Sequence, residues 1–490
     1  MLAWLVVGLY GLSLVVIFFY ALLQASLAIN YLRTKKNQAN TLKPLVDFPF
    51  VTIQLPIYNE KYVVERLLEQ TVKLNWPKDK IEFQILDDST DETTEILQRE
   101  IEKFVLEGFQ IYLVRRSDRV GFKAGALKHG LLTAKGEFIA IFDADFMPDP
   151  EFLNQTVPYF EDENIGVVQT RWEHLNRDFS ILTKLQAFAL DAHFSVEQVG
   201  RNVKNHFINF NGTAGIWRKE TIIDAGGWEA DTLTEDLDLS YRAQLKNWKF
   251  VYCEDIGSPA ELPVAMSALK SQQFRWTKGG AETFKKMCWR LLTQPKLGFM
   301  HRIHGMVHLF NSSVFVFVLL LAICSVPLVY LVSGNKVLSI WVDYSAVFFI
   351  STIFLVFYYA VSYREKADNK FQKLIKFSYR FIQFLVVTMG LSYYNAQAVI
   401  MGYFGKKTAF VRTPKFNADQ SSTGSWRKNA YLNSKLKFSS LIELVLGLYF
   451  AAAIVFGLVS GIYGMVPFHT LLSLGFLSVF TYSIAEKKGV

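Results

Sequence analysis

Cysteine is scarce in this chain: Cys253, Cys288 and Cys324 are the only three among 490 residues, and they lie far apart. Their number is odd and their spacing matches no zinc-binding pattern, which excludes a disulfide framework and leaves buried free thiols as the expectation. Hydrophobic residues make up 51% of the sequence and charged residues 20%. This balance excludes a fibrous or a disordered chain, and the length allows two or three domains.

Charged residues are also missing from several long stretches. About 20 apolar residues suffice to cross the hydrocarbon core of a bilayer. The first uncharged stretch, Leu2–Ile29, is too long for the core of a signal peptide and has no basic segment before it, so we predict a retained helix. The uncharged stretches predict five transmembrane helices, in residues 1–30, 305–335, 337–363 and, as a pair, 440–485.

Lysine and arginine gather on one side of these predicted helices, in residues 33–43, 364–380 and 487–488. Basic loops stay in the cytosol, so residues 31–304 are predicted to face the cytosol. Residues 381–404 are apolar enough to span, but they contain polar Gln383 and Asn395, and a span here would move the basic segment 405–437 to the other side. We therefore predict that residues 364–404 are a basic and interfacial helical segment, with a sixth span over residues 381–404 as the alternative.

The net charge of +8 lies mainly beside the apolar stretches. Anionic membrane lipid is the simpler partner for such charge, so we expect contact with membrane lipid and no binding of nucleic acid.

Residues 50–272 alternate between short apolar segments and helical patterns. Strands are predicted at residues 51–55, 83–86, 111–114 and 138–142, and helices at 60–74, 92–105 and 123–134. This alternation predicts an α/β domain with a doubly wound, mostly parallel sheet, inserted between transmembrane helices as residues 31–276. Amphipathic interface helices are expected to follow at residues 277–304.

Aspartates follow two of these predicted strands: Asp87 and Asp88 follow one, and Asp143 and Asp145 the other. Ligands of such sheets bind beyond the carboxyl ends of the strands, so the two clusters are expected to meet at one rim. Asp143 and Asp145 suit a hard divalent cation that grips a diphosphate, although D-x-D alone is also typical of a capped loop.

Three further motifs can each be interpreted either as part of a catalytic site or as an ordinary structural feature. Lys123 begins a helix, where a cation and free N–H groups suit phosphate, although a solvated lysine has the same pattern. Glu235 and Asp236 offer a general base or an acidic helix start. Arg275 and Trp276, after Gln272, suit a leaving phosphate and a sugar ring, or else lipid headgroups. The order of the motifs along the chain favours the catalytic reading.

Together, Asp88, Asp143-x-Asp145, Thr-Glu-Asp236 and Gln272-x-x-Arg275-Trp276 resemble the D, DxD, TED, QxxRW series of processive family 2 membrane glycosyltransferases. The stretches QLPIYNEKYVVERLL, GFKAGAL, AIFDADF and AGGWEADTLTEDLDL are most similar to cellulose-synthase-like mannan and glucomannan synthases. The resemblance covers residues 50–290 densely. It implies a GT-A fold and an enzyme that moves a hexose from a nucleotide sugar.

The resemblance also implies roles for individual residues. It assigns the base to Asp236, donor binding to Asp87, Asp88, Lys123, Asp143, Asp145, Gln272 and Arg275, and acceptor binding to Trp276, Asn211, Gly212, Thr213 and Glu235. Asp143 and Asp145 are expected to bind a Mg²⁺ or Mn²⁺ ion. Phe410, Arg412, Thr413 and Lys415, within residues 405–437, are similar to a gating-loop motif, with Arg-Thr-Pro-Lys in place of Val-Thr-x-Lys.

The function implied is inverting transfer from GDP-mannose or UDP-glucose to a growing β-linked glycan, with β-1,4 mannan, glucomannan or glucan as the expected product. The glycan is expected to leave through a channel of the same chain, with room for an accessory export subunit. The expected location is the bacterial inner membrane. A lipid glycosyltransferase that adds one sugar to ceramide or another lipid is the alternative, since such enzymes share these motifs. A receptor or transporter without catalysis has little use for Asp236 and the segment 272–276.

Overall fold

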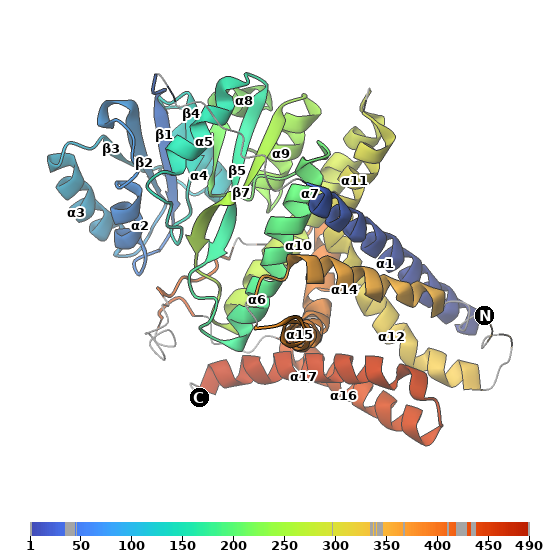
Figure 1. Cartoon of the computed structure of the whole chain (residues 1–490). Helices are drawn as coiled ribbons and strands as arrows, with labels where there is room; N and C mark the ends of the chain where they lie inside the picture. Colours follow the sequence, from blue (N-terminus) through green and yellow to red (C-terminus); the bar gives the residue numbers. More distant parts are fainter. Residues whose placement is uncertain are drawn as a thin grey trace.

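The computed structural model describes residues 2–34, 45, 47–295, 297–333, 337, 340, 346–365, 368–408, 411–417, 429–432 and 438–488. The described chain forms a sheet domain and a set of long helices, joined by one long helix that contacts both (Figure 1).

Among the described residues, seven strands form one sheet. They are β1 (Val51–Ile57), β2 (Ile81–Asp87), β3 (Ile111–Val114), β4 (Phe138–Ile141), β5 (Ile165–His174), β6 (Gly215–Arg218) and β7 (Lys249–Ala260), in the spatial order β3-β2-β1-β4-β6-β5-β7. The first four are parallel, as the alternating sequence predicted. β6 runs antiparallel to both β4 and β5, so the sheet is mostly parallel but mixed.

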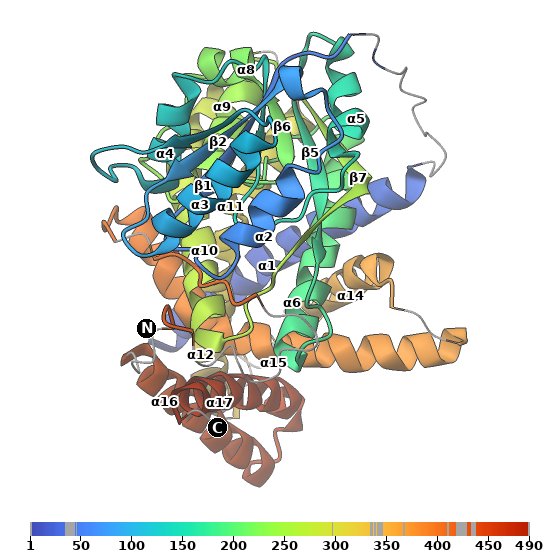
Figure 2. The same cartoon turned by 90° about the vertical axis from the view of Figure 1, so that its left-hand side faces the viewer.

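Helices cover both faces of the sheet. α2 (Val64–Thr71), α3 (Thr93–Leu106) and α5 (Phe152–Thr156) pack on one face, and α4 (Phe122–Leu131), α8 (Lys219–Asp224) and α9 (Glu235–Leu245) on the other. Figure 2 shows α2 and α3 in front of the sheet and α9 behind it. In β4, Phe138 and Ala140 point into one core while Ile139 and Ile141 point into the other. A strand buried on both faces has no polar alternation, which explains its continuous apolar run.

A second group of helices connects the sheet domain to the membrane part. α6 (Ile181–Ala192), the π-helix η3 (His193–Glu197) and α7 (Gln198–Asn202) follow β5. α10 (Met266–Thr293) follows β7 and packs against α9, α11 and α15. It carries the segment Gln272–Trp276 and extends through most of the region 277–304.

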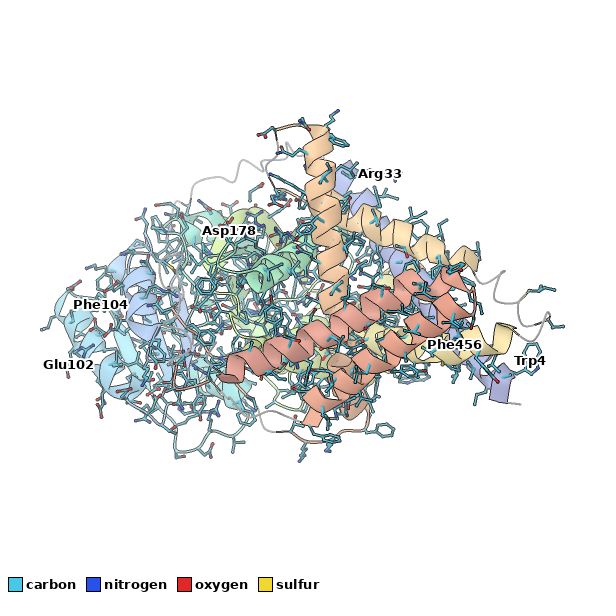
Figure 3. All side chains as sticks on the ribbon, turned by 90° about the horizontal axis from the view of Figure 1, so that it is seen from below. Trp4, Arg33, Glu102, Phe104, Asp178 and Phe456 are labelled. Carbon is cyan, nitrogen blue, oxygen red and sulfur yellow. The ribbon has the colours of Figure 1, made fainter. Side chains whose placement is uncertain are left out.

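Within the described residues, five helices are long and apolar enough to cross a membrane: α1 (Leu2–Arg33), α11 with α12 (Phe299–Phe310 and Val314–Ser333), α15 (Lys370–Tyr403), α16 (Phe438–Val459) and α17 (Val466–Lys488). Trp4 of α1 and Phe456 of α16, both exposed, lie far from Phe104 of α3 in Figure 3. Four of these five agree with the predicted spans.

The remaining predicted span, residues 337–363, lies only partly within the described residues. Residues 338–339 and 341–345 lie outside the described part, and α14 (Ile350–Ser362), with the 3₁₀ turn Ala346–Phe349 before it, is a shorter apolar helix. α15, which was predicted as an interfacial segment, is among the helices long and apolar enough to cross a membrane. It lies across α17 (Figure 3), at a crossing where a Cβ on Gly390 would come within 2.3 Å of the carbonyl oxygen of Gly475. Its placement at the membrane interface stays a prediction.

Candidate active site

One cavity lies beyond the carboxyl ends of β1, β2 and β4, where ligands bind in sheets of this kind. Residues of α10 and three residues of the segment 412–415 also line it. The predicted site residues that line it are Asp88, Lys123, Asp143, Asp145, Asn211, Gly212, Glu235, Asp236, Gln272, Arg275, Trp276, Arg412, Thr413 and Lys415. The two aspartate clusters therefore meet at one rim, although 56 residues separate Asp87 from Asp143.

Two of the predicted residues, Asp87 and Thr213, do not line this cavity, and a third lies outside the described residues. The buried Asp87 carboxylate accepts hydrogen bonds from Ser89 N (2.9 Å) and Thr94 Oγ1 (2.7 Å), so it holds the turn after β2. The Thr213 hydroxyl accepts a hydrogen bond from the backbone N–H of Asp143 at 2.9 Å, which fixes the start of the D-x-D segment. Phe410 lies outside the described residues.

The two carboxylates of the D-x-D segment have different partners. Asp143 pairs with the ammonium of Lys123, which also donates to the carbonyl oxygen of Gly212 at 2.8 Å. Burial disfavours that ammonium, but Asp143 and Glu235 outweigh burial and raise the pKa of Lys123. Asp145 is buried, and its Oδ2 accepts from Lys415 Nζ at 2.7 Å and from Glu261 N at 3.2 Å. Its Oδ1 is buried and has no hydrogen-bond partner among the described residues, as expected of a carboxylate with a further cation to bind.

Asp236 lies in the first turn of α9, close to Gly212 and Lys123. Its Oδ1 accepts from the backbone N–H of Leu237 at 2.8 Å. Burial, followed by the nearby carboxylate of Glu235, raises the pKa of Asp236 to about 7. Burial also raises the pKa of Glu235. A carboxyl group with a pKa near neutrality can both take up and release a proton at physiological pH, which is what a general base requires.

α10 places the end of the Q-x-x-R-W segment against the same cavity. The guanidinium of Arg275 donates from Nη2 to Thr413 Oγ1 at 2.9 Å, and the Trp276 ring lies 6.5 Å from the ring of Trp172 between centroids. Trp172 also lines the cavity, and sequence reasoning did not single it out. It lies near the carboxyl end of β5, a strand that was not predicted, so no strand-end signal identified it.

The segment 411–417 contacts carboxylates of the cavity. Arg412 pairs with Glu60 and donates to the carbonyl oxygen of Tyr58 at 3.1 Å, and the backbone N–H of Phe416 donates to Glu261 Oε1 at 2.8 Å. Burial is the main cause that raises the pKa of Glu60 and of Glu261 to about 7. Sequence reasoning missed both glutamates, although Glu60 lies in the quoted stretch QLPIYNE.

Two arginine side chains lie near Asp88, which lines the cavity. Arg116 donates to Asp88 Oδ1 at 2.8 Å and to Oδ2 as well, in a bidentate pair. The Arg119 guanidinium lies 3.2 Å from the ring centroid of Tyr58, and both residues line the cavity. These aromatic and cationic groups suit a nucleotide, and neither Arg116 nor Arg119 was predicted as a site residue.

The fold and this site define a GT-A-like glycosyltransferase domain joined to membrane helices. The family model described as "Glycosyltransferase like family 2" matches residues 49–279, and the one described as "Cellulose synthase" matches residues 217–482. The chain belongs to the cellulose synthase family.

Curated plant proteins are similar to half of the chain. A "Probable glucomannan 4-beta-mannosyltransferase 6" of Oryza sativa subsp. japonica is 42% identical over 262 residues, 52% of this chain and 46% of that protein. A "Glucomannan 4-beta-mannosyltransferase 2" of Arabidopsis thaliana is 41% identical over 263 residues, 53% and 49% of the two chains. One from Cyamopsis tetragonoloba is 43% identical over 262 residues, 52% and 50%. The matched region thus spans about half the length of these relatives.

A solved structure shares the fold. It is the mannosyltransferase PcManGT from Pyrobaculum calidifontis in complex with GDP-Man and Mn²⁺, with a TM-score of 0.57 and 17% identity over 82% of this chain and 100% of that one. At this identity the likeness concerns the fold, and it agrees with the predicted GT-A architecture.

Proposed function

We propose that this protein is an inverting membrane hexosyltransferase that extends a β-1,4-linked mannan or glucomannan from a nucleotide sugar. One observation carries the proposal: Asp236, buried and with a raised pKa, lines the same cavity as the D-x-D carboxylates and the Arg275–Trp276 pair. A base, a diphosphate-binding end and an aromatic platform in one cavity are the parts that glycosyl transfer needs.

GDP-mannose is the favoured donor, and UDP-glucose is the second candidate. The names of the plant relatives specify 4-beta-mannosyl transfer to glucomannan, and the archaeal mannosyltransferase was solved with GDP-Man. The Asp88, Arg116 and Arg119 end of the cavity is proposed to hold the nucleoside, and Lys123 the diphosphate. Both assignments follow from the charge of these side chains and from their positions on the strand-end rim.

In the proposed reaction, Asp236 removes the proton from the acceptor hydroxyl as that oxygen attacks the anomeric carbon. The bond to the nucleoside diphosphate breaks on the opposite face, so an α-linked donor gives a β-linked product. Lys123 and Arg275 stabilise the charge that develops on the departing diphosphate. Trp276, with Trp172 beside it, is positioned to stack on the terminal sugar of the acceptor.

Asp143 and Asp145 fit a divalent cation, since the buried Asp145 Oδ1 meets no hydrogen-bond partner in the part of the chain that the structure describes. Carboxylate oxygens are also the preferred ligands of Mg²⁺ and Mn²⁺. When bound there, the ion would supply positive charge to the donor diphosphate. Mn²⁺ is the better first choice for an assay, because the archaeal mannosyltransferase was solved with it.

The lipid glycosyltransferase alternative is less favoured, because the names of the plant proteins above specify mannosyl transfer to glucomannan, a polysaccharide, and not to a lipid. Export of the glycan through the membrane helices remains part of the proposal. α10, which carries Trp276, packs directly on α15, and its Phe274 ring lies 5.7 Å from the Tyr394 ring of that helix. An accessory export subunit remains a proposed partner.

The five candidate membrane helices among the described residues agree with the expectation of a membrane protein. The similar proteins do not support the expected location in a bacterial inner membrane. The relatives named above are plant proteins, and we propose a Golgi membrane, with residues 47–295 on its cytosolic side.

The proposal is tested with purified protein in detergent and with radiolabelled GDP-mannose and UDP-glucose supplied separately, with and without Mn²⁺. Products are divided into an organic-soluble and an ethanol-insoluble fraction. We expect GDP-mannose to label insoluble material that an endo-β-mannanase digests, and the Asp236→Asn variant to label none. Label confined to the organic phase would establish the lipid alternative instead.

A further inference from the structure

The carboxyl-terminal half of α10 lies against the loop that leads into α9 and Asp236. The backbone N–H of Leu233 donates to Glu282 Oε2 at 2.9 Å, and the hydroxyls of Thr234 and Thr283 lie 3.1 Å apart. Thr234 is the N-cap of α9, so its position sets where the first turn of that helix begins.

The two segments approach so closely that only a glycine fits on α10. A Cβ on Gly279 would lie 2.8 Å from the backbone nitrogen of Thr234 and 2.6 Å from its Cγ2. Contacts between real Cβ atoms and backbone are essentially never this short. The loop before Asp236 is therefore pressed directly onto the backbone of α10.

Lys286 adds an ionic contact one turn further along α10. Its Nζ lies 2.6 Å from Glu229 Oε2, 2.8 Å from Asp231 Oδ1 and 3.0 Å from Asp238 Oδ1. Burial disfavours its charge, but the carboxylates outweigh burial and raise the pKa of Lys286, so it stays an ammonium. These three carboxylates are close enough to one another to hold a metal ion, and the ammonium already takes the place of such a cation.

Asp238 ties this contact to the helix that carries the base. Its side chain is fully buried, and its Oδ2 accepts from Arg242 Nε at 2.8 Å, one turn later in α9. Arg242 also donates to the carbonyl oxygen of Gly227 at 2.8 Å. The first turn of α9 is thus fixed from one side by Arg242 and from the other by Lys286.

α10 therefore contacts both the cavity and the loop that leads to the proposed base. Residues 272–276 near its start line the cavity, and residues 279–286 hold the loop of the base. We propose that Lys286 is a positioning residue that, with Thr283, fixes Asp236 relative to the acceptor platform of Trp276, an inference that rests on the proposed hexosyl transfer. Catalytic groups must be held within about 0.5 Å of their productive geometry, and a rigid helix shared by the base loop and the acceptor site meets that demand.

The test compares Lys286→Met and Lys286→Arg with Lys285→Met as the matched control. Lys285 is the adjacent lysine on the same helix, but its Nζ donates to the carbonyl oxygen of Tyr403 at 2.9 Å, on α15. Thr283→Val, which changes no charge, is the second variant. Initial rates of transfer are measured against donor concentration and divided by the number of nucleotide sites, counted by GDP binding to each preparation.

We expect Lys286→Met to lower kcat per nucleotide site by about tenfold to a hundredfold, the size of effect that misplacing a catalytic group by up to about 1 Å produces. The donor KM should stay unchanged, Lys286→Arg should recover most of the rate, and Thr283→Val should lower kcat by a smaller factor. Lys285→Met should keep the wild-type kcat.

Equal kcat in Lys286→Met and Lys285→Met would overturn the inference while leaving the proposed function intact. Loss of GDP binding in Lys286→Met, with the wild-type rate in the sites that remain, would also overturn it, since Lys286 would then only stabilise the fold. A divalent ion bound in stoichiometric amount, lost in the Asp231→Asn variant but retained in Asp145→Ala, would also overturn it, because a metal ion and not Lys286 would then hold these carboxylates. Absence of any hexosyl transfer by the wild-type protein would overturn the proposed function, and this inference with it.

Discussion

Gly212→Ala tests the position of the base directly. Gly212 has φ +77°, and a Cβ built on it would lie 2.9 Å from Asp236 Oδ2 and 3.5 Å from Lys123 Nζ. Ordinary van der Waals contact of a Cβ begins near 3.4 Å, so the carboxylate of Asp236 must withdraw by about 0.5 Å. The other oxygen of this carboxylate accepts from Leu237 N at 2.8 Å, so withdrawal also disturbs that hydrogen bond.

The substitution should have two separable effects. An alanine in the left-handed region costs about 1–2 kcal/mol in stability, wherever it is placed. Misplacing a catalytic group by about 1 Å can cost about a hundredfold in rate, so a shift of half that size should cost about tenfold. Tenfold corresponds to about 1.4 kcal/mol in the activation barrier.

Gly108→Ala is the matched control. Gly108 also has a left-handed φ of +85°, it follows α3 at a distance from the cavity, and a Cβ there would meet nothing within 4 Å. Thermal unfolding should show similar destabilisation in both variants, whereas only Gly212→Ala should lower kcat, measured as mannose transferred per nucleotide-binding site. The reasoning fails if the two variants keep the same kcat, because the carboxylate of Asp236 would then not act as the proposed base from this position.

Three further predictions concern the same cavity. Asp236→Asn should lower the rate of transfer by about a hundredfold or more, the usual contribution of a general base, while GDP binding measured by calorimetry stays within a few-fold. Loss of both binding and transfer would instead make Asp236 a structural residue. Because only the ionised carboxylate accepts a proton and its pKa is raised to about 7, kcat/KM should rise between about pH 6 and 8, whereas a base with an ordinary carboxyl pKa would give a flat profile there. Asp145→Ala should abolish the dependence of donor binding on Mn²⁺, and a variant that still binds donor in a Mn²⁺-dependent way would contradict the assignment of the cation to Asp145.

Local patterns in the sequence predicted the parallel half of the sheet. The expected strands at 51–55, 83–86 and 111–114 correspond to β1, β2 and β3, because strands buried on both faces are short apolar runs between helical patterns. The helices α3 and α4 were predicted to within a few residues, whereas α2 is shorter than the predicted 60–74. The antiparallel strand β6, with β5 and β7, escaped prediction, since its pairing is decided by residues far away in the chain.

The motifs of the sequence also predicted many of the residues that line the cavity, because strand-end aspartates and an ordered set of motifs specify one rim of one sheet. It did not determine how they are partnered. That Asp87 holds a turn while Asp88 lines the cavity depends on the path of the chain after β2, and both are aspartates in the same dipeptide. Likewise, Lys415 was assigned to a gating loop, but its pairing with Asp145 required the fold.

Only the tertiary structure decided which side chains are buried and which residues far apart in the sequence contact each other. The raised pKa of Asp236 comes from desolvation in an assembled cavity, and no local sequence pattern encodes it. The same holds for Lys286, an ordinary lysine in the sequence of α10, which becomes a partner of the base-bearing loop because two segments about 50 residues apart pack against each other. The sequence thus determined which reactive side chains this protein has. The packing of α10 on α9 decided which of them are buried, paired and brought together at the cavity.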